Sequence, residues 1–167
     1  MDRAIKTVIK MINRRGYTIT HKNDGNIIAV NDKKKKIVFF TDIVNKFNSD
    51  KAKEYINIVH GMGIPQCIII YKEVTSMANK IVINSLDIIL ELFHIDKVQI
   101  DITEHRLQPK YIKLSDDEAK EFKKKYGIRH PVQLTTDPIS LYYFYQRGDI
   151  IKIIRKNGYI TYRIVKG

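Results

Sequence analysis

Histidine and cysteine side chains, which carry much of the chemistry of enzyme and metal sites, are scattered along this sequence. The five histidines are His21, His60, His94, His105 and His130. None has the close spacing of a metal-binding pair, and a single cysteine, Cys67, excludes a zinc site built from several thiolates. The chain also lacks the GxxxxGKS/T, GxGxxG and GxSxG motifs of nucleotide and acyl chemistry. The sequence therefore predicts no cofactor, no metal and no catalytic site.

A metal-dependent nuclease is the strongest enzyme alternative, because small α/β domains with a basic surface often carry that activity. Such cleavage needs clustered carboxylates and a lysine around a metal ion. The nearest sequence is Asp32-Lys33-Lys34, but it falls at a predicted turn. The apolar run at residues 67–71, which predicts a buried strand, contains no carboxylate. We therefore predict a non-catalytic protein.

Binding chemistry is better represented than catalysis. Thirty lysines and arginines against eighteen acidic residues give a net charge of +12 and a pI near 9.7. Residues 1–100 hold sixteen basic and ten acidic side chains and residues 101–167 hold fourteen and eight, so each part carries about +6. Such a charge favours a polyanionic partner, nucleic acid or an anionic membrane surface.

One lysine run has a defined place. Strands predicted at residues 27–30 and 36–40 are joined by a turn at Asn31-Asp32, which makes a hairpin. At or near its tip lie Lys33, Lys34, Lys35 and Lys36. These lysines could contact DNA phosphates, or the run could be a solvated turn that keeps the protein in solution.

The remaining N-terminal pattern predicts helices around a sheet. Ile5, Val8, Ile9 and Ile12 have helical spacing, so a helix over residues 2–15 is expected to end at Gly16. A second helix, capped by Asn48 or Ser49, is predicted to run to about residue 60, before the buried strand at 67–71. Strand, helix and strand in this order predict a right-handed crossover. A further helix at 75–83 and a strand at 86–92 follow.

The C-terminal pattern begins with a predicted strand at residues 98–102, after a break in the apolar pattern at 94–97. Ser115 and Glu118 form a capping-box sequence for a helix that ends before Gly127. Asp137-Pro138 predicts a chain reversal and a short helix over 139–145.

Two runs rich in β-branched and aromatic residues, at 148–155 and 159–165, predict a closing β-hairpin. Ile151 and Ile153 fall on one face of the first run, and Ile150 on the other. Gly148 is expected to take a positive φ angle in the turn before the hairpin, with Asp149 bonding the backbone locally.

Five blocks in the C-terminal part carry a family resemblance. In order they are Thr103-Glu104-His105 with Leu107-x-Pro109, Leu114-Ser115-x-x-Glu118, Asp137-Pro138, the RGDIIKIIR sequence from Arg147, and the YITYRIV sequence from Tyr159. This pattern resembles the C-terminal domain of the fifth common small subunit of eukaryotic nuclear RNA polymerases and its archaeal counterpart. The chain departs from it at Leu141, usually basic, at Phe144, usually glycine, and in the shorter loop at residues 156–158.

Shorter matches extend the resemblance to the N-terminal part. Lys6-Thr7-Val8, Met11 and Arg15-Gly16-Tyr17 resemble the opening helix of the eukaryotic protein's jaw domain, and Val38-Phe39-Phe40 resembles one of its strands. The expected fold is therefore α+β, with an N-terminal α/β jaw-like domain with a small mixed sheet at residues 1–96. A small C-terminal α+β polymerase-assembly domain with a β-hairpin is expected at residues 97–167.

The resemblance implies a non-catalytic subunit of a multisubunit DNA-directed RNA polymerase. It implies docking on the largest subunit through the C-terminal domain, contact with other polymerase subunits, and a jaw near downstream duplex DNA. The candidate subunit-interface residues are Thr103, Glu104, His105, Pro109, Asp137, Pro138, Arg147, Gly148, Asp149, Arg155, Tyr159, Thr161, Tyr162 and Arg163. Alternatively, the arginines among them could bind nucleic acid. His105 has the chemistry of a general base, but we expect it to form a polar cluster with Thr103 and Glu104 at the end of the predicted strand.

Charge alone would equally suit a free-standing nucleic-acid-binding protein, which is the alternative from another class. No stretch approaches the roughly 18 consecutive apolar residues of a membrane span, so an intracellular protein without a membrane partner is expected. Abundant lysine and isoleucine with no tryptophan indicate an AT-rich coding genome, which is compatible with a large DNA virus as well as with some cellular organisms. The expected location is the nucleus for a cellular protein and the host cytoplasm or virion for a viral one.

Overall fold

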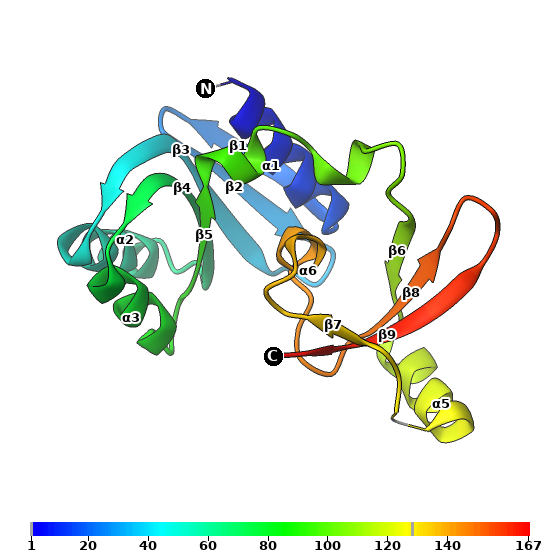
Figure 1. Ribbon diagram of the computed structural model, residues 1–167. Coiled ribbons are helices and arrows are strands. Elements are labelled where there is room, and N and C mark those ends of the chain that lie inside the picture. Colours follow the sequence, from blue (N-terminus) through cyan, green and yellow to red (C-terminus); the bar gives the residue numbers. More distant parts are fainter. Residues whose placement is uncertain (1, 128) are drawn as a thin grey trace. The chain divides into compact units, whose positions relative to one another are not determined.

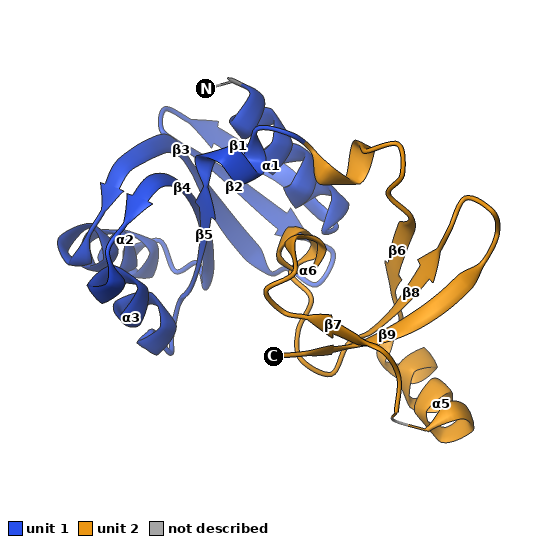
Figure 2. Ribbon diagram, in the orientation of Figure 1, with its two compact units in different colours: residues 1–100 blue, residues 101–167 orange. Residues whose placement is uncertain are grey.

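The computed structural model describes residues 2–127 and 129–167 and divides into two compact units, residues 1–100 and 101–167 (Figure 2). Each unit has its own sheet, flanked by its own helices. The chain is therefore an α+β protein, as the sequence predicts. Among the described residues, no helix is both long and apolar enough to cross a membrane.

Unit 1 is built on a five-stranded mixed sheet in the order β1-β2-β3-β4-β5 (Figure 1). The first three strands are antiparallel, and β3, β4 and β5 are parallel. Parallel neighbours need a crossover connection, which α2 supplies between β3 and β4 and α3 between β4 and β5. The elements are α1 Asp2–Arg14, β1 Tyr17–Asn23, β2 Asn26–Asn31, β3 Lys36–Phe47, α2 Ser49–Gly61, β4 Gln66–Val74, α3 Ser76–Asn84, β5 Ile89–His94 and α4 Ile95–Val98.

The helices of unit 1 bury both faces of the sheet. On the face covered by α2 and α3, Val38, Phe40 and Ile69 belong to one buried cluster. Because side chains alternate along a strand, Phe39 and Ile68 point to the other face, where both are fully buried. The predicted two-sided burial of β4 is thus confirmed.

Helix α1 is confirmed, but its buried face is rotated from the predicted one. Val8 and Ile12 are fully buried as expected. Ile5 and Ile9 are only half-buried. The other buried positions are Ala4, Thr7 and Met11. The buried face therefore includes small Ala4 and Thr7, and the two isoleucines lie at its margins.

Three strand predictions in unit 1 need correction. Strand β1 was not predicted, because most of its side chains are polar and exposed. Strand β3 runs on to Phe47 after a register irregularity between Phe40 and Ile43, where polar residues made the pattern appear to stop. Strand β5 starts at Ile89, since Leu86 is 96% exposed and cannot belong to a buried strand.

The strand predicted at residues 98–102 is wrong. Helix α4 ends at Val98, and a 3-10 turn, η1 (Ile102–Glu104), follows. Local side-chain caps favour these turns over an extended backbone. The His94 ring accepts a hydrogen bond from the Asp96 amide, and the Asp101 carboxylate accepts one from the Thr103 amide. The two units divide between Ile100 and Asp101.

Unit 2 is built on a four-stranded sheet in the order β6-β8-β9-β7. The predicted hairpin is confirmed as antiparallel β8 and β9, and β7 runs parallel to β9. Strands β6 and β7 were not predicted, because they have four and three residues and little alternation. The elements after η1 are β6 Lys110–Lys113, α5 Asp116–Tyr126, β7 Val132–Leu134, α6 Pro138–Tyr143, β8 Ile150–Ile154 and β9 Ile160–Lys166.

The hairpin separates two small cores, as its predicted alternation requires. Ile151 and Ile153 pack with Ile139, Tyr145 and Val165 on one face. On the other face the buried residues of the core are Phe122, Ile150 and Ile164.

Both helices of unit 2 begin at capped residues. Helix α5 has the predicted capping box, in which the Ser115 hydroxyl accepts from the Glu118 amide and the Glu118 carboxylate accepts from the Ser115 amide. These bonds hold the pKa of Glu118 below its usual value. Helix α6 is capped by Asp137, whose carboxylate accepts from the Ile139 amide, and starts with Pro138.

Candidate functional site

The turn before β8 connects three strands of unit 2. Gly148 has a φ of +93°, as predicted, and its N–H donates to the Val165 carbonyl at 2.9 Å. Asp149 accepts a bond from the Gln146 amide through its carboxylate and one from the Val165 amide through its carbonyl. The same carboxylate lies 2.8 Å from the Lys113 ammonium group of β6. The turn therefore holds β6, β8 and β9 together.

Replacing Gly148 with valine is expected to destabilise unit 2 by about 1–3 kcal/mol, because a β-branched side chain resists a positive φ angle. A Cβ atom at this position would meet nothing within 4 Å, so the cost comes from the backbone. Hydrogen exchange of the β8 and β9 amides measures the effect. The control is Gly61→Ala, where the added Cβ also meets nothing but φ is not positive. Equal effects of the two substitutions would contradict the prediction.

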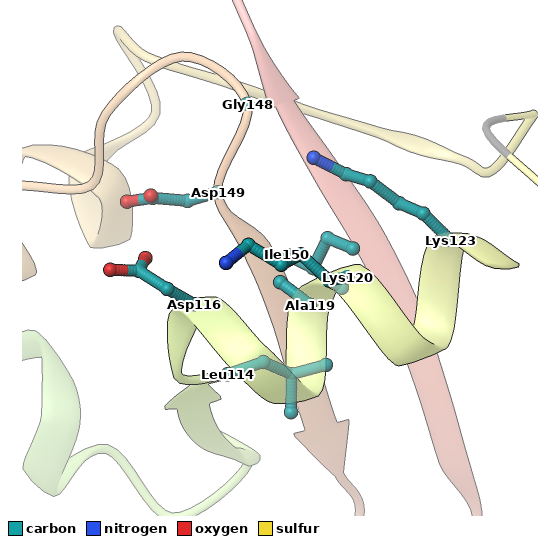
Figure 3. Close-up of a pocket in the computed structure, with 8 residues that line it drawn as sticks. All are labelled: Leu114, Asp116, Ala119, Lys120, Lys123, Gly148, Asp149 and Ile150. Carbon is teal, nitrogen blue, oxygen red and sulfur yellow. The ribbon is translucent and has the colours of Figure 1, made fainter.

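A hollow of about 310 Å³ lies between α5 and this turn (Figure 3). Leu114, Ala119 and Ile150 contribute its apolar part. Figure 3 shows the carboxylates of Asp116 and Asp149 at one end, with the ammonium group of Lys120 beside them, and the ammonium group of Lys123 at the other end. An apolar floor with both charges at its rim suits the side chains of a partner protein.

The Thr103-Glu104-His105 block lies on η1 and not at a strand end. The buried Asp101 carboxylate accepts bonds from the Thr103 amide at 3.0 Å and the Thr103 hydroxyl at 2.6 Å, and from the Tyr142 hydroxyl at 3.4 Å. The Leu107 amide donates to the ring of His105 at 3.3 Å. His105 thus supports the backbone of the turn. Pro109 lies half-buried just before β6.

Sequence reasoning did not select Asp101 or Tyr142, although together they fix η1 against α6. The spacing of Asp101 and Thr103 is that of a local side-chain cap, and it could have indicated the turn. The partner Tyr142 lies 41 positions away, so no local pattern could have paired the two residues.

Other candidate residues gather around one phenol on β6. Burial raises the pKa of Tyr111, the Asp137 carboxylate raises it further, and Arg163 and Arg155 lower it. These three charged groups therefore lie close enough to act on one hydroxyl. Thr161 lies on the same face of the hairpin as Arg163, since Thr161 pairs with Ile153 and Arg163 with Ile151.

The remaining hairpin candidates have different surroundings. Tyr162 lies on the α5 face, with its ring 4.5 Å from that of Phe122, so it is mainly a core residue. Tyr159 is 62% exposed at the hairpin loop, which its carbonyl closes by accepting from the Arg155 amide. Arg147 is exposed in the turn before Gly148. The candidates thus divide between the hollow beside α5 and the opposite, Tyr111 face.

The four candidate lysines lie at the predicted hairpin tip: Lys33, Lys34 and Lys35 are in the loop between β2 and β3, and Lys36 is the first residue of β3. The Asn31 side chain accepts from the Lys35 amide and its carbonyl accepts from the Lys34 amide, both at 2.9 Å, which folds the loop tightly. Lys34 has a φ of +59°. Lys33, Lys34, Lys35 and Lys36 are all exposed. Within the described residues none of them is ion-paired, so all four ammonium groups are available to a polyanion.

Enzyme chemistry finds little support in the geometry. Asp32 lies in the exposed turn. Burial raises the pKa of the Cys67 thiol to about 12, so it stays protonated at neutral pH. Across residues 2–127 and 129–167, no three histidine, cysteine or acidic side chains are grouped to hold a metal ion.

Comparisons with known proteins find similarity to subunits of DNA-directed RNA polymerases. The model of the RNA polymerase Rpb5 C-terminal domain family matches residues 100–165. A protein of invertebrate iridescent virus 6, named as DNA-directed RNA polymerase subunit 454R, is 32% identical and covers 94% of this chain and 95% of its own. The subunit rpabc1 of RNA polymerases I, II and III from Dictyostelium discoideum is 28% identical, and the match covers 95% of this chain and 93% of that protein. The DNA-directed RNA polymerase subunit 5-like protein 1 of Arabidopsis thaliana is 27% identical, and the match covers 95% of this chain and 91% of that protein.

Proposed function

The chain belongs to the Rpb5 family of DNA-directed RNA polymerase subunits, which serve transcription, and we propose that it docks on the largest subunit of a multisubunit polymerase through residues 101–167. The observation that carries the proposal is the near coincidence of the family match, residues 100–165, with compact unit 2. The family model thus matches a part of the chain that is compact by itself, which supports a docking role for that part as a domain.

Two features of unit 2 support docking on a protein. The hollow beside α5 offers apolar surface with Asp116, Asp149 and Lys123 at its rim. On the other face, Arg155 and Arg163 lie near the Tyr111 hydroxyl. Arginine forms paired hydrogen bonds with carboxylates and carbonyls of a partner as readily as with phosphates.

The proposed role of unit 1 is that of a jaw element beside downstream duplex DNA. The support is the loop at residues 33–36, whose four lysines are exposed and not ion-paired within the described residues. A compact loop with four positive charges can neutralise several phosphates at once.

We further infer that the chain contributes no catalytic group. Polymerase chemistry would then belong to the large subunits, and this chain would contribute position and stability. A viral protein would act in the host cytoplasm or virion, and a cellular one in the nucleus.

Affinity capture of the tagged full-length chain from the cells that express it tests the docking proposal. The chain is expected to retain the largest polymerase subunit in stoichiometric amounts. Changing Arg147→Glu and Arg155→Glu together should lower that retention at least about tenfold, because reversed charges oppose the contacts of the wild-type surface. Both arginines are exposed, so the fold should tolerate the change.

A charge-matched control is Lys53→Glu with Lys80→Glu at exposed positions of unit 1, which should retain the subunit normally. Recovery of the wild-type chain without any large polymerase subunit would contradict docking. That result would favour a free-standing nucleic-acid-binding protein.

A further inference from the structure

Strand β7 is an edge strand of the sheet in unit 2, paired only with β9. The Pro131 carbonyl accepts from the Ile164 amide, and the Thr135 amide donates to the Lys166 carbonyl. Alternate residues of a parallel strand bond to the same neighbour, so the peptide groups of Val132 and Leu134 point away from β9. The Leu134 carbonyl accepts from the Asp137 amide. Within residues 2–127 and 129–167, the N–H and C=O of Val132 and the N–H of Leu134 have no backbone partner and are open to a further strand.

The side chains at these positions are also exposed. Val132 is 41% and Leu134 is 56% solvent-exposed, whereas Gln133 between them is 3% exposed. An open backbone edge with apolar side chains is a site where another chain can add as a strand.

Of the four edge strands in the described residues, β7 is the least protected. Strand β6 carries lysines at both ends. Strand β1 has a register irregularity between Ile19 and His21 and a mostly polar surface. In β5 the apolar side chains of Leu90 and Leu92, which alternate as Val132 and Leu134 do in β7, pack against the core of unit 1. Lysines, bulges, prolines and short length are the usual protections of an edge. Strand β7 is short and follows Pro131, but it has no lysine and no bulge.

Charge indicates what can bind there. The sequence from Gly127 to Thr136 contains Arg129 and His130 but no carboxylate. Lys166 pairs in register with Leu134, and Lys123 to Lys125 end helix α5 nearby in sequence. Two copies of this chain joined edge to edge would bring like charges together, which is unfavourable. An acidic segment would be attracted.

We propose that an extended, acidic segment of another polymerase subunit adds to β7 as the fifth strand of this sheet. Its alternate apolar side chains pack beside Val132 and Leu134, and its carboxylates lie near Arg129 and Lys166. The inference rests on the proposed function, because it takes the partner from the polymerase complex. To the proposed docking function it adds the strand edge that is contacted, β7, and the chemical class of the segment that binds there.

Hydrogen exchange of the full-length chain, alone and in the purified polymerase, tests the proposal. The Val132 and Leu134 amides should exchange rapidly in the isolated chain and at least about tenfold more slowly in the complex. Carbodiimide coupling should also join the Lys166 amine to a carboxylate of the partner segment, which mass spectrometry then identifies. Lys166→Arg should abolish that cross-link without changing the charge.

Two acidic substitutions at the edge, Val132→Glu and Leu134→Glu, should remove both the protection and the cross-link. Both positions are exposed, so folding should persist. Matched controls, Ile83→Glu and Leu86→Glu, lie on exposed apolar positions of unit 1 and should leave both signals intact.

Unchanged exchange at residues 131–135 in a polymerase that contains the chain would overturn the strand-addition proposal and leave docking standing. Protection that survives the edge substitutions, or a cross-link to a segment that is not acidic, would also overturn it. Failure of the chain to enter the polymerase at all would contradict docking and this inference together.

Discussion

Replacing Glu91 with alanine is expected to lower the free energy of unfolding of unit 1 by about 3–5 kcal/mol. Both carboxylate oxygens of Glu91 accept hydrogen bonds from the Arg15 guanidinium at 2.8 Å. One of them also accepts a hydrogen bond from the side-chain amide of Gln66 at 2.6 Å. The side chains of Arg15 and Glu91 are 3% and 8% exposed. Removing the carboxylate takes two hydrogen bonds and the charge of Glu91 away from a buried guanidinium.

Native-state hydrogen exchange of the β4 amides measures this effect within unit 1. The control is Glu54→Ala, because Glu54 and Lys51 form an exposed ion pair whose loss should have a far smaller effect on stability. An apolar pair, Arg15→Met with Glu91→Leu, should recover much of the lost stability. A Glu91→Ala effect no larger than that of Glu54→Ala would contradict the account.

The second large effect is expected on DNA binding. Changing Lys33, Lys34, Lys35 and Lys36 together to glutamine should weaken binding of the assembled polymerase to downstream duplex DNA. Each lost phosphate contact removes about 0.9 from the slope of log K against log salt, so losing two contacts should flatten the plot by about 1.8. Titrations of the complex with duplex DNA at several salt concentrations measure that slope.

A matched control separates local contact from overall charge. Changing four exposed lysines of unit 1 outside this loop, Lys22, Lys53, Lys72 and Lys80, to glutamine removes the same charge. This variant should keep the wild-type slope. An unchanged slope for the β2–β3 loop variant would mean that the loop is only a solvated turn, and equal flattening in both variants would indicate a general charge effect.

The sequence predicted those features whose causes are local. The capping box needs only Ser115 and Glu118, three positions apart. The hairpin and its two faces follow from the alternation around Ile150 and Ile151, and the positive φ of Gly148 from the turn before them. These features can be predicted from the sequence because residues that are close together in the chain make the whole interaction.

Features that depend on distant pairing could not be predicted in the same way. The Arg15 to Glu91 ion pair joins residues 76 positions apart, and neither residue has a local pattern that indicates its partner. Strand β7 is only three residues long, and its pairing with β9 gives it its identity. The interface residues proposed from the family resemblance lie on described elements, and the contacts proposed for them are with another chain, about which this sequence carries no pattern.

Phe144 shows how a departure from a family pattern acquires a physical meaning. The family usually has glycine at this position, and here Phe144 adopts the left-handed conformation, with a φ of +56° and a ψ of +45°, at the C-terminal end of α6. The position therefore demands a conformation that glycine adopts freely and phenylalanine does not.

The central claim is that residues 101–167 suffice for docking on the largest polymerase subunit. Its most direct test is co-expression of that subunit with a tagged fragment of residues 101–167 or of residues 1–100, followed by affinity capture. Unit 2 has its own sheet and two buried clusters, so its fragment should fold, with partner binding adding stability. The account predicts that the 101–167 fragment retains the largest subunit and the 1–100 fragment does not; retention by the 1–100 fragment alone would contradict it.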